Sequence, residues 1–222
     1  MENNKEVKLL RLQRTEGKLL TKSQYNIVIG LTLLWGILIN VGMAVFLTPY
    51  IIQIDFRIIL VLYLVLSFGC TFLVYRSSSP ALSFLGFTGL AIGMGLLLTS
   101  YLTLFTEATI YSAFLATGII VVSMMLISLF FPAFFLSLGR VLIFALLGSI
   151  AVELIGGLLL HYPMFWMNYV IVVIFAGYVG FDWAKAQVYP KTMDNAIDSA
   201  ADIYIDIVNI FIRLLSIMGR KK

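Results

Sequence analysis

The chain has 222 residues, of which 61% are hydrophobic and 12% are charged, and its formal net charge is +4. Soluble domains are about half apolar and about a quarter charged, so this composition excludes a soluble globular protein and indicates an integral membrane protein. The positive charges are concentrated at the two ends of the chain without interleaved aromatic residues, which favours anionic lipid headgroups over nucleic acid as a partner.

The first 22 residues form a basic segment that precedes the first apolar run. Because that run is long enough to span a bilayer, we expect it to be the first transmembrane helix rather than a cleaved signal peptide. The basic segment is predicted to be cytoplasmic, either as an amphipathic stretch on the inner leaflet or without fixed structure. Residues 220–222 form a second basic stretch, the tail of the chain.

Between residues 23 and 219 the sequence contains seven apolar runs, each predicted to cross the membrane as a helix. A span requires roughly 20 apolar residues, and short connections containing turn-forming residues separate these runs. The predicted spans are residues 27–47, 58–75, 81–101, 110–131, 141–160, 165–181 and 196–218. The expected fold class is therefore all-α, a bundle of seven transmembrane helices.

The distribution of lysine and arginine predicts that the N-terminus is cytoplasmic, because cytoplasmic loops of membrane proteins are enriched in these residues. With that orientation the cytoplasmic side holds Lys5, Lys8, Arg11, Arg14, Lys18, Lys22, Arg76, Arg140, Lys185 and Lys191. The outer side holds Arg57, Arg220, Lys221 and Lys222. Seven full spans place the basic tail outside, against the rule. The alternative is six full spans followed by a segment that enters the membrane and returns.

The last predicted span differs from the others because polar residues recur in it at helical spacing. Intervals of four, four, four, three and four residues separate Asp194, Asp198, Asp202, Asp206, Asn209 and Arg213. Such spacing places these side chains on one face of a helix, opposite Ile203, Ile207, Ile210 and Leu214. Lipid cannot solvate this stripe, so we expect the last helix to lie inside a ring formed by the others, with its acidic face lining a wet cavity.

The aspartates of this stripe are expected to have different roles. Asp194 and Asp198 are predicted to be the solvated start of the helix, where carboxylates interact favourably with the helix dipole. Asp206 has apolar residues on both sides, and a carboxylate at membrane depth is costly unless it faces water, a partner or a cation. Asp182 closes the preceding apolar run in the same way. Asp182 and Asp206 are therefore the leading candidates for function.

The sequence around these two aspartates forms a recognisable motif. Residues 180–187 read Gly-Phe-Asp-Trp-Ala-Lys-Ala-Gln, and residues 203–215 read Ile-Tyr-Ile-Asp-Ile-Val-Asn-Ile-Phe-Ile-Arg-Leu-Leu. This motif resembles the C-terminal signature of the Bax inhibitor-1 family, also called the transmembrane Bax inhibitor motif family. The interval from Asp182 to Asp206, 24 residues, is similar to the family spacing. Phe181 stands where the family has tyrosine, and Lys185 where it has glutamine, so Asp182 is expected to have gained a cation.

The resemblance implies a seven-helix membrane bundle in which the other six helices wrap the last one. Bacterial members look like pH-sensitive calcium leak channels, so the resemblance implies that function, with calcium ions and protons as partners and no enzymatic activity. Carried over by position, Asp182 and Asp206 form a proton-sharing pair that acts as pH sensor and gate, and Arg76 is its counter-charge. Two carboxylates within hydrogen-bond reach cannot both ionise cheaply in a low dielectric, so such a pair titrates in coupled steps.

Calcium is a hard cation that takes oxygen ligands, and an acidic stripe would concentrate it. Asp182 and Asp206 are the candidates for transient calcium binding. Further candidates for the ion path are Asp202, Asp198, Glu153 and Asn209. Glu153 lies deep in the fifth predicted span and is interpreted either as a path residue or as a residue that pairs helices. Motifs of metalloenzymes are absent, so no resident metal or cofactor is expected.

The sequence leaves three alternatives to a leak channel open. A proton-coupled cation exchanger needs the same carboxylates, and a non-conducting membrane partner protein needs none of them. An intramembrane aspartyl protease also pairs two aspartates, but its motif places glycine before the second aspartate, where this chain has Ile205. The short loops and the lack of sorting signals indicate a bacterial plasma membrane.

Overall fold

The computed structural model describes residue 11, residues 19–159 and residues 165–219, and in these ranges all regular structure is helical. The predicted basic segment falls largely outside them, because only Arg11 and residues 19–22 of it are described. The predicted basic tail, residues 220–222, also lies outside the described residues.

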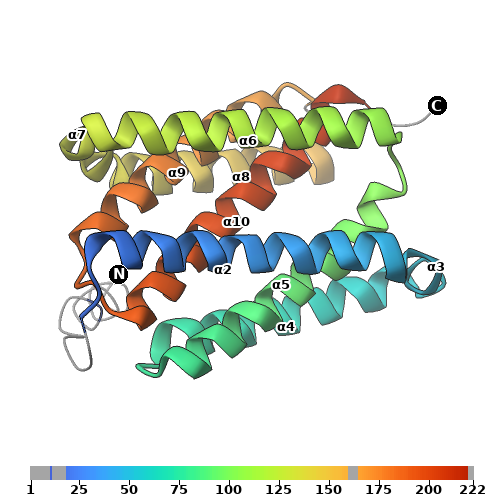
Figure 1. Cartoon of the computed structure of the whole chain (residues 1–222). Coiled ribbons are helices and arrows are strands. Elements are labelled where there is room, and N and C mark those ends of the chain that lie inside the picture. Colours follow the sequence, from blue (N-terminus) through green and yellow to red (C-terminus); the bar gives the residue numbers. More distant parts are fainter. Residues whose placement is uncertain (1–10, 12–18, 160–164, 220–222) are drawn as a thin grey trace. The chain divides into compact units, whose positions relative to one another are not determined.

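The helices follow one another with short connections (Figure 1). In chain order they are α2 (Lys22–Gly42), the π-helical turn η1 (Met43–Leu47), α3 (Thr48–Ile51), α4 (Phe56–Arg76), α5 (Pro80–Leu102), α6 (Glu107–Phe130), α7 (Pro132–Ser137), α8 (Gly139–Leu154), the π-helical turn η2 (Ile155–Leu159), α9 (Met167–Val188) and α10 (Met193–Met218).

Six helical stretches within the described residues are long and apolar enough to cross a membrane, and they coincide with the first six predicted spans. They are Lys22–Ile51, Phe56–Arg76, Pro80–Leu102, Glu107–Phe130, Gly139–Gly157 and Met167–Val188. The protein is thus an all-helical integral membrane protein. The predicted seventh span corresponds to α10, which carries Asp202, Asp206 and Arg213 and is too charged to belong to this group. The count of seven spans stays a prediction.

Local sequence explains where several of these helices begin. Thr21 and Gln24 form a reciprocal cap at the start of α2, in which each side chain accepts a hydrogen bond from the other residue's backbone N–H. Pro80 and Pro132 stand in the first turns of α5 and α7, where a missing N–H costs nothing. Thr192 caps α10 by accepting a hydrogen bond from the backbone N–H of Asn195 at 3.2 Å.

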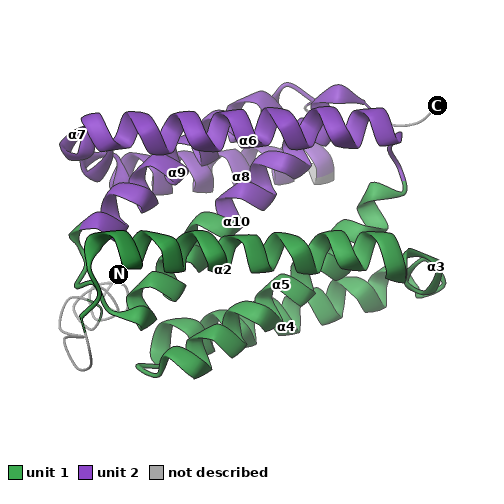
Figure 2. Cartoon of the chain, in the orientation of Figure 1, with its two compact units in different colours: residues 1–103, 188–204 green, residues 104–187, 205–222 purple. Residues whose placement is uncertain are grey.

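The chain forms two compact units (Figure 2). Unit 1 comprises Met1–Thr103 and Val188–Tyr204, and unit 2 comprises Leu104–Gln187 and Ile205–Lys222. Helix α10 therefore contributes its first half to unit 1 and its second half to unit 2.

In unit 1, the first half of α10 packs against α2 and α5 through Tyr204. This side chain is fully buried, donates a 2.7 Å hydrogen bond to Asn40 Oδ1 and meets the ring of Phe87 edge-on at 5.4 Å. Gly36 of α2 permits the approach, because a Cβ there would lie 2.8 Å from Phe87 and 3.0 Å from Tyr204. Helices α4 and α5 lie side by side in the same unit (Figure 1).

In unit 2, α9 packs closely against α6 and α7 around Gly180. The hydroxyl of Ser128 on α6 donates a 2.7 Å hydrogen bond to the Gly180 carbonyl. The ring of Phe135 on α7 occupies the space of a side chain at this position, since a Cβ on Gly180 would lie 2.2 Å from it. This close packing holds α9 in place at Gly180, two residues before Asp182.

Helix α10 is the most enclosed of the long helices, because no residue from 194 to 217 is exposed. Both its polar stripe and its apolar face are covered, with Asp198, Ile203 and Ile210 each 0% exposed. Its helical structure is continuous over 26 residues, so a segment that enters the membrane and turns back is wrong for this stretch. The central position of the last helix stays a prediction, and the burial of α10 is consistent with it.

Candidate functional site: two charged clusters along helix α10

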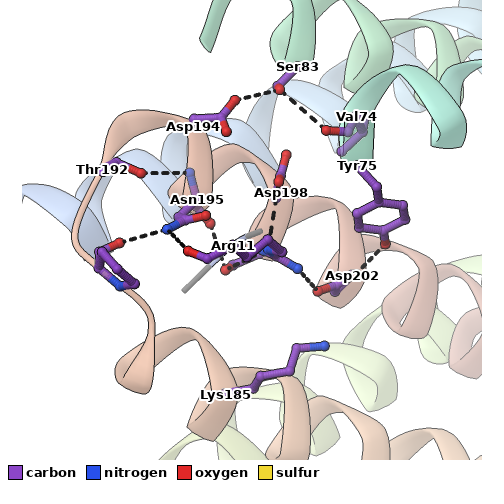
Figure 3. A network of polar contacts seen from close by, with 12 residues as sticks. Arg11, Val74, Tyr75, Ser83, Lys185, Thr192, Asp194, Asn195, Asp198 and Asp202 are labelled. Atoms are coloured by element: carbon purple, nitrogen blue, oxygen red, sulfur yellow. Dashed lines mark hydrogen bonds and ion pairs between the residues drawn. The ribbon is translucent and has the colours of Figure 1, made fainter. Parts of the chain in front are cut away.

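The first charged cluster lies on the first half of α10 and is centred on the guanidinium of Arg11 (Figure 3). Arg11 Nη1 donates a 3.0 Å hydrogen bond to Asp202 Oδ2, and Nη2 donates one of 3.2 Å to Ser199 Oγ. Arg11 Nε lies 3.6 Å from Asp198 Oδ2. The residue is only 3% exposed. We call Arg11, Asp198, Ser199, Asp202 and their contacting neighbours the Arg11 cluster.

Aromatic residues complete the surroundings of the guanidinium. Its central carbon lies 4.5 Å from the ring centroid of Tyr189 and 5.9 Å from that of Tyr75, which are cation–π distances. The hydroxyl of Tyr75 also donates a hydrogen bond to Asp202. Burial lowers the pKa of Arg11, but Asp202 and Asp198 more than offset it, so the net pKa is raised. Arg11 is therefore a permanently charged group held between two carboxylates.

Asp194 and Asn195 extend the cluster along the first turn of α10 (Figure 3). The hydroxyl of Ser83 donates a 2.6 Å hydrogen bond to Asp194 Oδ1. The side-chain amide of Asn195 donates to the backbone carbonyls of Arg11 at 3.1 Å and Pro190 at 3.0 Å. Asp194 is 4% and Asp198 0% exposed, so the prediction that these two carboxylates are the solvated start of the helix is wrong. Ser83 and Arg11 replace water as their partners.

Arg11 is the residue that sequence reasoning missed. It entered the prediction only as one of several basic residues of a cytoplasmic leader. A signal was present: a row of aspartates four residues apart on a buried helix needs a counter-charge, and six of the chain's 15 lysines and arginines lie in that leader. The tertiary fold decides which of these basic residues contacts the aspartates, and the spacing of residues in the sequence does not reveal it.

The second charged cluster lies in unit 2 and contains Asp182 on α9 and Asp206 on α10. Both carboxylates belong to buried residues, 6% and 4% exposed respectively. Both lie within electrostatic reach of the Tyr178 hydroxyl, one turn before Asp182. The structure thus brings the two predicted sensor residues into one neighbourhood. The sharing of a proton between them stays a prediction.

Lys185 supplies a cation to Asp182. Its ammonium forms an ion pair with Asp182 Oδ1 three residues earlier on α9 and lies 5.2 Å from the ring centroid of Phe181. The expectation that Asp182 gained a cation where the family has glutamine is therefore confirmed. The two departures from the motif, Phe181 and Lys185, contact each other, and Lys185 pairs with the carboxylate.

Arg76, the predicted counter-charge of the pair, is the last residue of α4. Its side chain is exposed, and its guanidinium carbon lies 5.7 Å from the ring centroid of Phe72. A basic residue in the last turn of a helix interacts favourably with the helix dipole, so Arg76 also stabilises the end of its own helix, α4. The role of Arg76 toward Asp182 and Asp206 stays a prediction.

Glu153 forms a second ion pair within unit 2. Its two carboxylate oxygens accept hydrogen bonds from Arg213 at 2.5 and 3.0 Å, and Arg213 also donates to Asn168 Oδ1 at 3.1 Å. These contacts join α8, α9 and α10, so Glu153 pairs helices. Asn209, another path candidate, donates to the Ile205 carbonyl of its own helix at 2.8 Å.

The described residues contain no group of three or more histidine, cysteine, aspartate or glutamate side chains that could hold a metal ion. Transient calcium binding by Asp182 and Asp206 stays a prediction, one that requires only weak and reversible ligation.

Comparison with known proteins adds a family and two relatives. The family model described as "Inhibitor of apoptosis-promoting Bax1" matches residues 18–222. The inner membrane protein YbhL of Escherichia coli, from strains K12 and O6:H1, is 27% identical over 138 residues. The aligned region covers 58% of this chain and 59% of each relative, so the chain matches about three fifths of the length of these relatives.

Proposed function

Because the chain belongs to the family of inhibitors of apoptosis-promoting Bax1, we propose that it is a pH-sensitive calcium leak channel. The membership that residues 180–215 predicted is confirmed. We place the protein in a bacterial inner membrane, as the name of its relative YbhL suggests, with its N-terminus in the cytoplasm. One observation supports this proposal: Asp182 on α9 and Asp206 on α10 are both buried and belong to the same compact unit.

The chemistry of this neighbourhood favours a proton sensor. Two buried carboxylates close to each other cannot both ionise cheaply in a low dielectric, and binding one proton relieves their repulsion. When the pair binds or releases a proton, the ion pair between Asp182 and Lys185 therefore changes, and so does the interaction of Asp206 with α9. Since Asp206 belongs to α10 and Asp182 to α9, proton binding alters the interaction between two helices.

We propose that this change opens or closes a path for calcium along the polar stripe of α10. Three candidate path residues form ion pairs: Asp198 and Asp202 with Arg11, and Glu153 with Arg213. A calcium ion that moves along the stripe must compete with these cations for the carboxylates. Such competition suits a slow leak, because each binding step exchanges one cation for another.

The test is calcium flux into liposomes that contain the purified protein, measured between about pH 5 and pH 8. We expect the flux of the parent to depend on pH and that dependence to disappear in Asp182→Asn and Asp206→Asn. Asp194→Asn is the matched control, since Asp194 is equally buried but has Ser83 as its partner, and it should keep the response. The proposal is wrong if Asp182→Asn and Asp206→Asn both retain the pH profile of the parent.

The same experiment distinguishes the alternatives. A proton-coupled exchanger saturates with calcium and responds to an imposed proton gradient, which a channel does not. The family description favours a second candidate, a non-conducting inhibitor of cell-death proteins, and such a protein would show no flux in any variant. We also propose that the protein is not an enzyme. A membrane-embedded reporter peptide cleaved by the parent but not by Asp206→Ala would contradict this.

A further inference from the structure

An apolar groove of about 650 Å³ lies within unit 1, between α2, α5 and the first turns of α10. Its lining comes from side chains between residues 28 and 35 of α2 and between residues 80 and 84 of α5, and from Met193 and Ile197 of α10. Every lining side chain except Thr32 is apolar or aromatic. The volume is within the range of roughly 300 to 1,000 Å³ that is typical of ligand pockets, so the groove can hold a chain-like apolar ligand.

The wall of the apolar groove is held in place by contacts between α2 and α5. The indole N–H of Trp35 donates a 3.2 Å hydrogen bond to Thr88 Oγ1, and the Trp35 ring lies 6.1 Å from that of Phe84 at an angle of 31°. Thr32 and Ile197 are each 4% exposed and lie at the bottom, whereas Trp35 is 43% exposed and lies at the open edge. The groove is therefore already formed and is open along one side.

The depth of the apolar groove matches one leaflet of a bilayer. Helices α2 and α5 both belong to stretches that are long and apolar enough to cross the membrane. At about 1.5 Å per residue, Val28 and Trp35 lie roughly 9 and roughly 20 Å along α2 from Lys22, its first residue. The hydrocarbon core of a bilayer is about 30 Å thick, so one leaflet accounts for about 15 Å of it. The open side of the groove therefore meets lipid acyl chains.

Two lysines lie at the end of unit 1 where the apolar groove begins. Lys22 opens α2, and Lys191 stands two residues before Met193, in the connection that precedes α10. The backbone N–H of Leu20 donates a 2.8 Å hydrogen bond to the Lys191 carbonyl, and the Lys191 ammonium lies 4.6 Å from the ring centroid of Tyr25, so this connection contacts the start of α2. Burial, and then repulsion from Lys22, lower the pKa of Lys191. An anion near both ammonium groups would offset that repulsion.

We propose that the apolar groove binds one anionic phospholipid, with an acyl chain between α2, α5 and α10 and the phosphate beside Lys22 and Lys191. The groove selects for a chain and the lysines select for the headgroup, since basic residues at a membrane surface attract anionic lipids. With the N-terminus in the cytoplasm, as proposed above, this lipid belongs to the inner leaflet. The site uses none of the residues of the proposed pH sensor, so it stands or falls independently of the calcium leak.

The test is the quenching of Trp35 fluorescence by lipids with brominated acyl chains, because Trp35 lines the apolar groove. The purified full chain is placed in phosphatidylcholine liposomes that contain a small fraction of brominated phosphatidylglycerol or, for comparison, of brominated phosphatidylcholine. The double variant Trp166→Phe with Trp183→Phe leaves Trp35 as the only tryptophan. We expect the anionic lipid to quench Trp35 at a fraction on the order of tenfold lower than the zwitterionic lipid.

Substitutions separate the headgroup from the chain. Lys22→Gln and Lys191→Gln should each reduce the preference for the anionic lipid by about fivefold. Arg57→Gln removes the same charge at the start of α4 and is the matched control, with no expected change. Ala81→Phe fills the apolar groove and leaves both lysines in place, so it should abolish the preference. Leu82→Phe is its control, because Leu82 is 46% exposed and does not line the groove.

Native mass spectrometry of the parent, with its tryptophans unchanged, provides a second measurement. We expect the parent to retain one phosphatidylglycerol and Ala81→Phe to lose it. Equal quenching of Trp35 by the two lipids would overturn the proposal, as would a preference that survives both lysine substitutions. A preference that survives Ala81→Phe would mean that the lysines attract the headgroup without a chain in the groove, which also overturns it. A dimer that retains no lipid would assign the groove to a second copy of the chain instead.

Discussion

Asp198 and Asp206 lie eight residues apart on the same stripe of α10, and both are buried, yet their surroundings differ in kind. Asp198 shares the single charge of Arg11 with Asp202, so each carboxylate in this part of the helix has a permanently charged base as a partner. Asp206 shares a neighbourhood with another carboxylate, Asp182, and with Tyr178. The first arrangement is an ion pair, whereas the second is the one for which we propose a shared proton.

The difference follows from what the other helices present to α10. An aspartate that faces an arginine has no reason to bind a proton at physiological pH, because ionisation is what pairs it. An aspartate close to another carboxylate is stabilised by binding a proton, which is the situation that we propose for Asp206. Equal spacing along a helix thus supports two different chemistries, and each can be disturbed separately.

The largest expected effect is on stability and concerns Arg11. Arg11→Gln removes the guanidinium that pairs with Asp198 and Asp202 in a buried site, so we expect a loss of about 3 kcal/mol in the free energy of unfolding. On the proposal that Asp182 and Asp206 share a proton, Asp206→Asn should cost little, because it removes one of two competing carboxylates. Thermal unfolding in detergent compares the two. Equal losses in both variants would remove the distinction between the clusters.

A smaller loss is expected at the ion pair of Glu153 and Arg213, whose side chains are 32% and 27% exposed. Because these side chains are only partly buried, Glu153→Gln should lower the free energy of unfolding by about 1 to 2 kcal/mol, less than the change at Arg11. The double variant Glu153→Gln with Arg213→Gln should regain part of that loss, which a double-mutant cycle measures. Additive losses would mean that the two residues act independently.

Lys185 offers a way to tune the second cluster without removing a carboxylate. Lys185→Met deletes the ammonium that pairs with Asp182, so the ionised form of Asp182 becomes less favourable and the proton binds at higher pH. The midpoint of the calcium-flux response should move upward by about one pH unit. Arg76→Met tests the predicted counter-charge in the same assay. A midpoint that moves with Arg76 and not with Lys185 would reassign the cation of the pair.

The smallest expected effect concerns Lys191, in the connection between α9 and α10. Burial, and then repulsion from Lys22, lower the pKa of Lys191 below its ordinary value. Between the two pKa values the unfolded chain holds a proton that the folded chain has released, so stability rises with pH in that alkaline window. Lys191→Gln should flatten this rise, measured by unfolding at a series of alkaline pH values. An unchanged slope would contradict the shift.

The spans and the motif could be predicted because they are local properties of the chain. Apolar runs of sufficient length predicted the six membrane helices. The interval between Asp182 and Asp206 predicted the family. Helical spacing also predicted the polar stripe of α10, and the enclosure of that helix agrees with the argument that lipid cannot solvate the stripe.

The partners of the stripe could not be predicted, because they come from distant parts of the chain. Arg11 contacts residues more than 180 positions away, and Ser83 contacts Asp194 across 111 positions. Asp194 and Asp198 were therefore predicted to face solvent when they are buried. For the same reason the sequence does not decide whether Glu153 lines an ion path or pairs helices, since its partner Arg213 lies 60 positions further on.

Infrared difference spectroscopy of protonated carboxyl groups during a pH titration measures whether Asp182 and Asp206 share a proton. We expect a carboxyl signal in the parent that titrates in two coupled steps, and a single step in Asp182→Asn and in Asp206→Asn. A titration in which either substitution removes one independent signal and leaves the other carboxyl unchanged would contradict it.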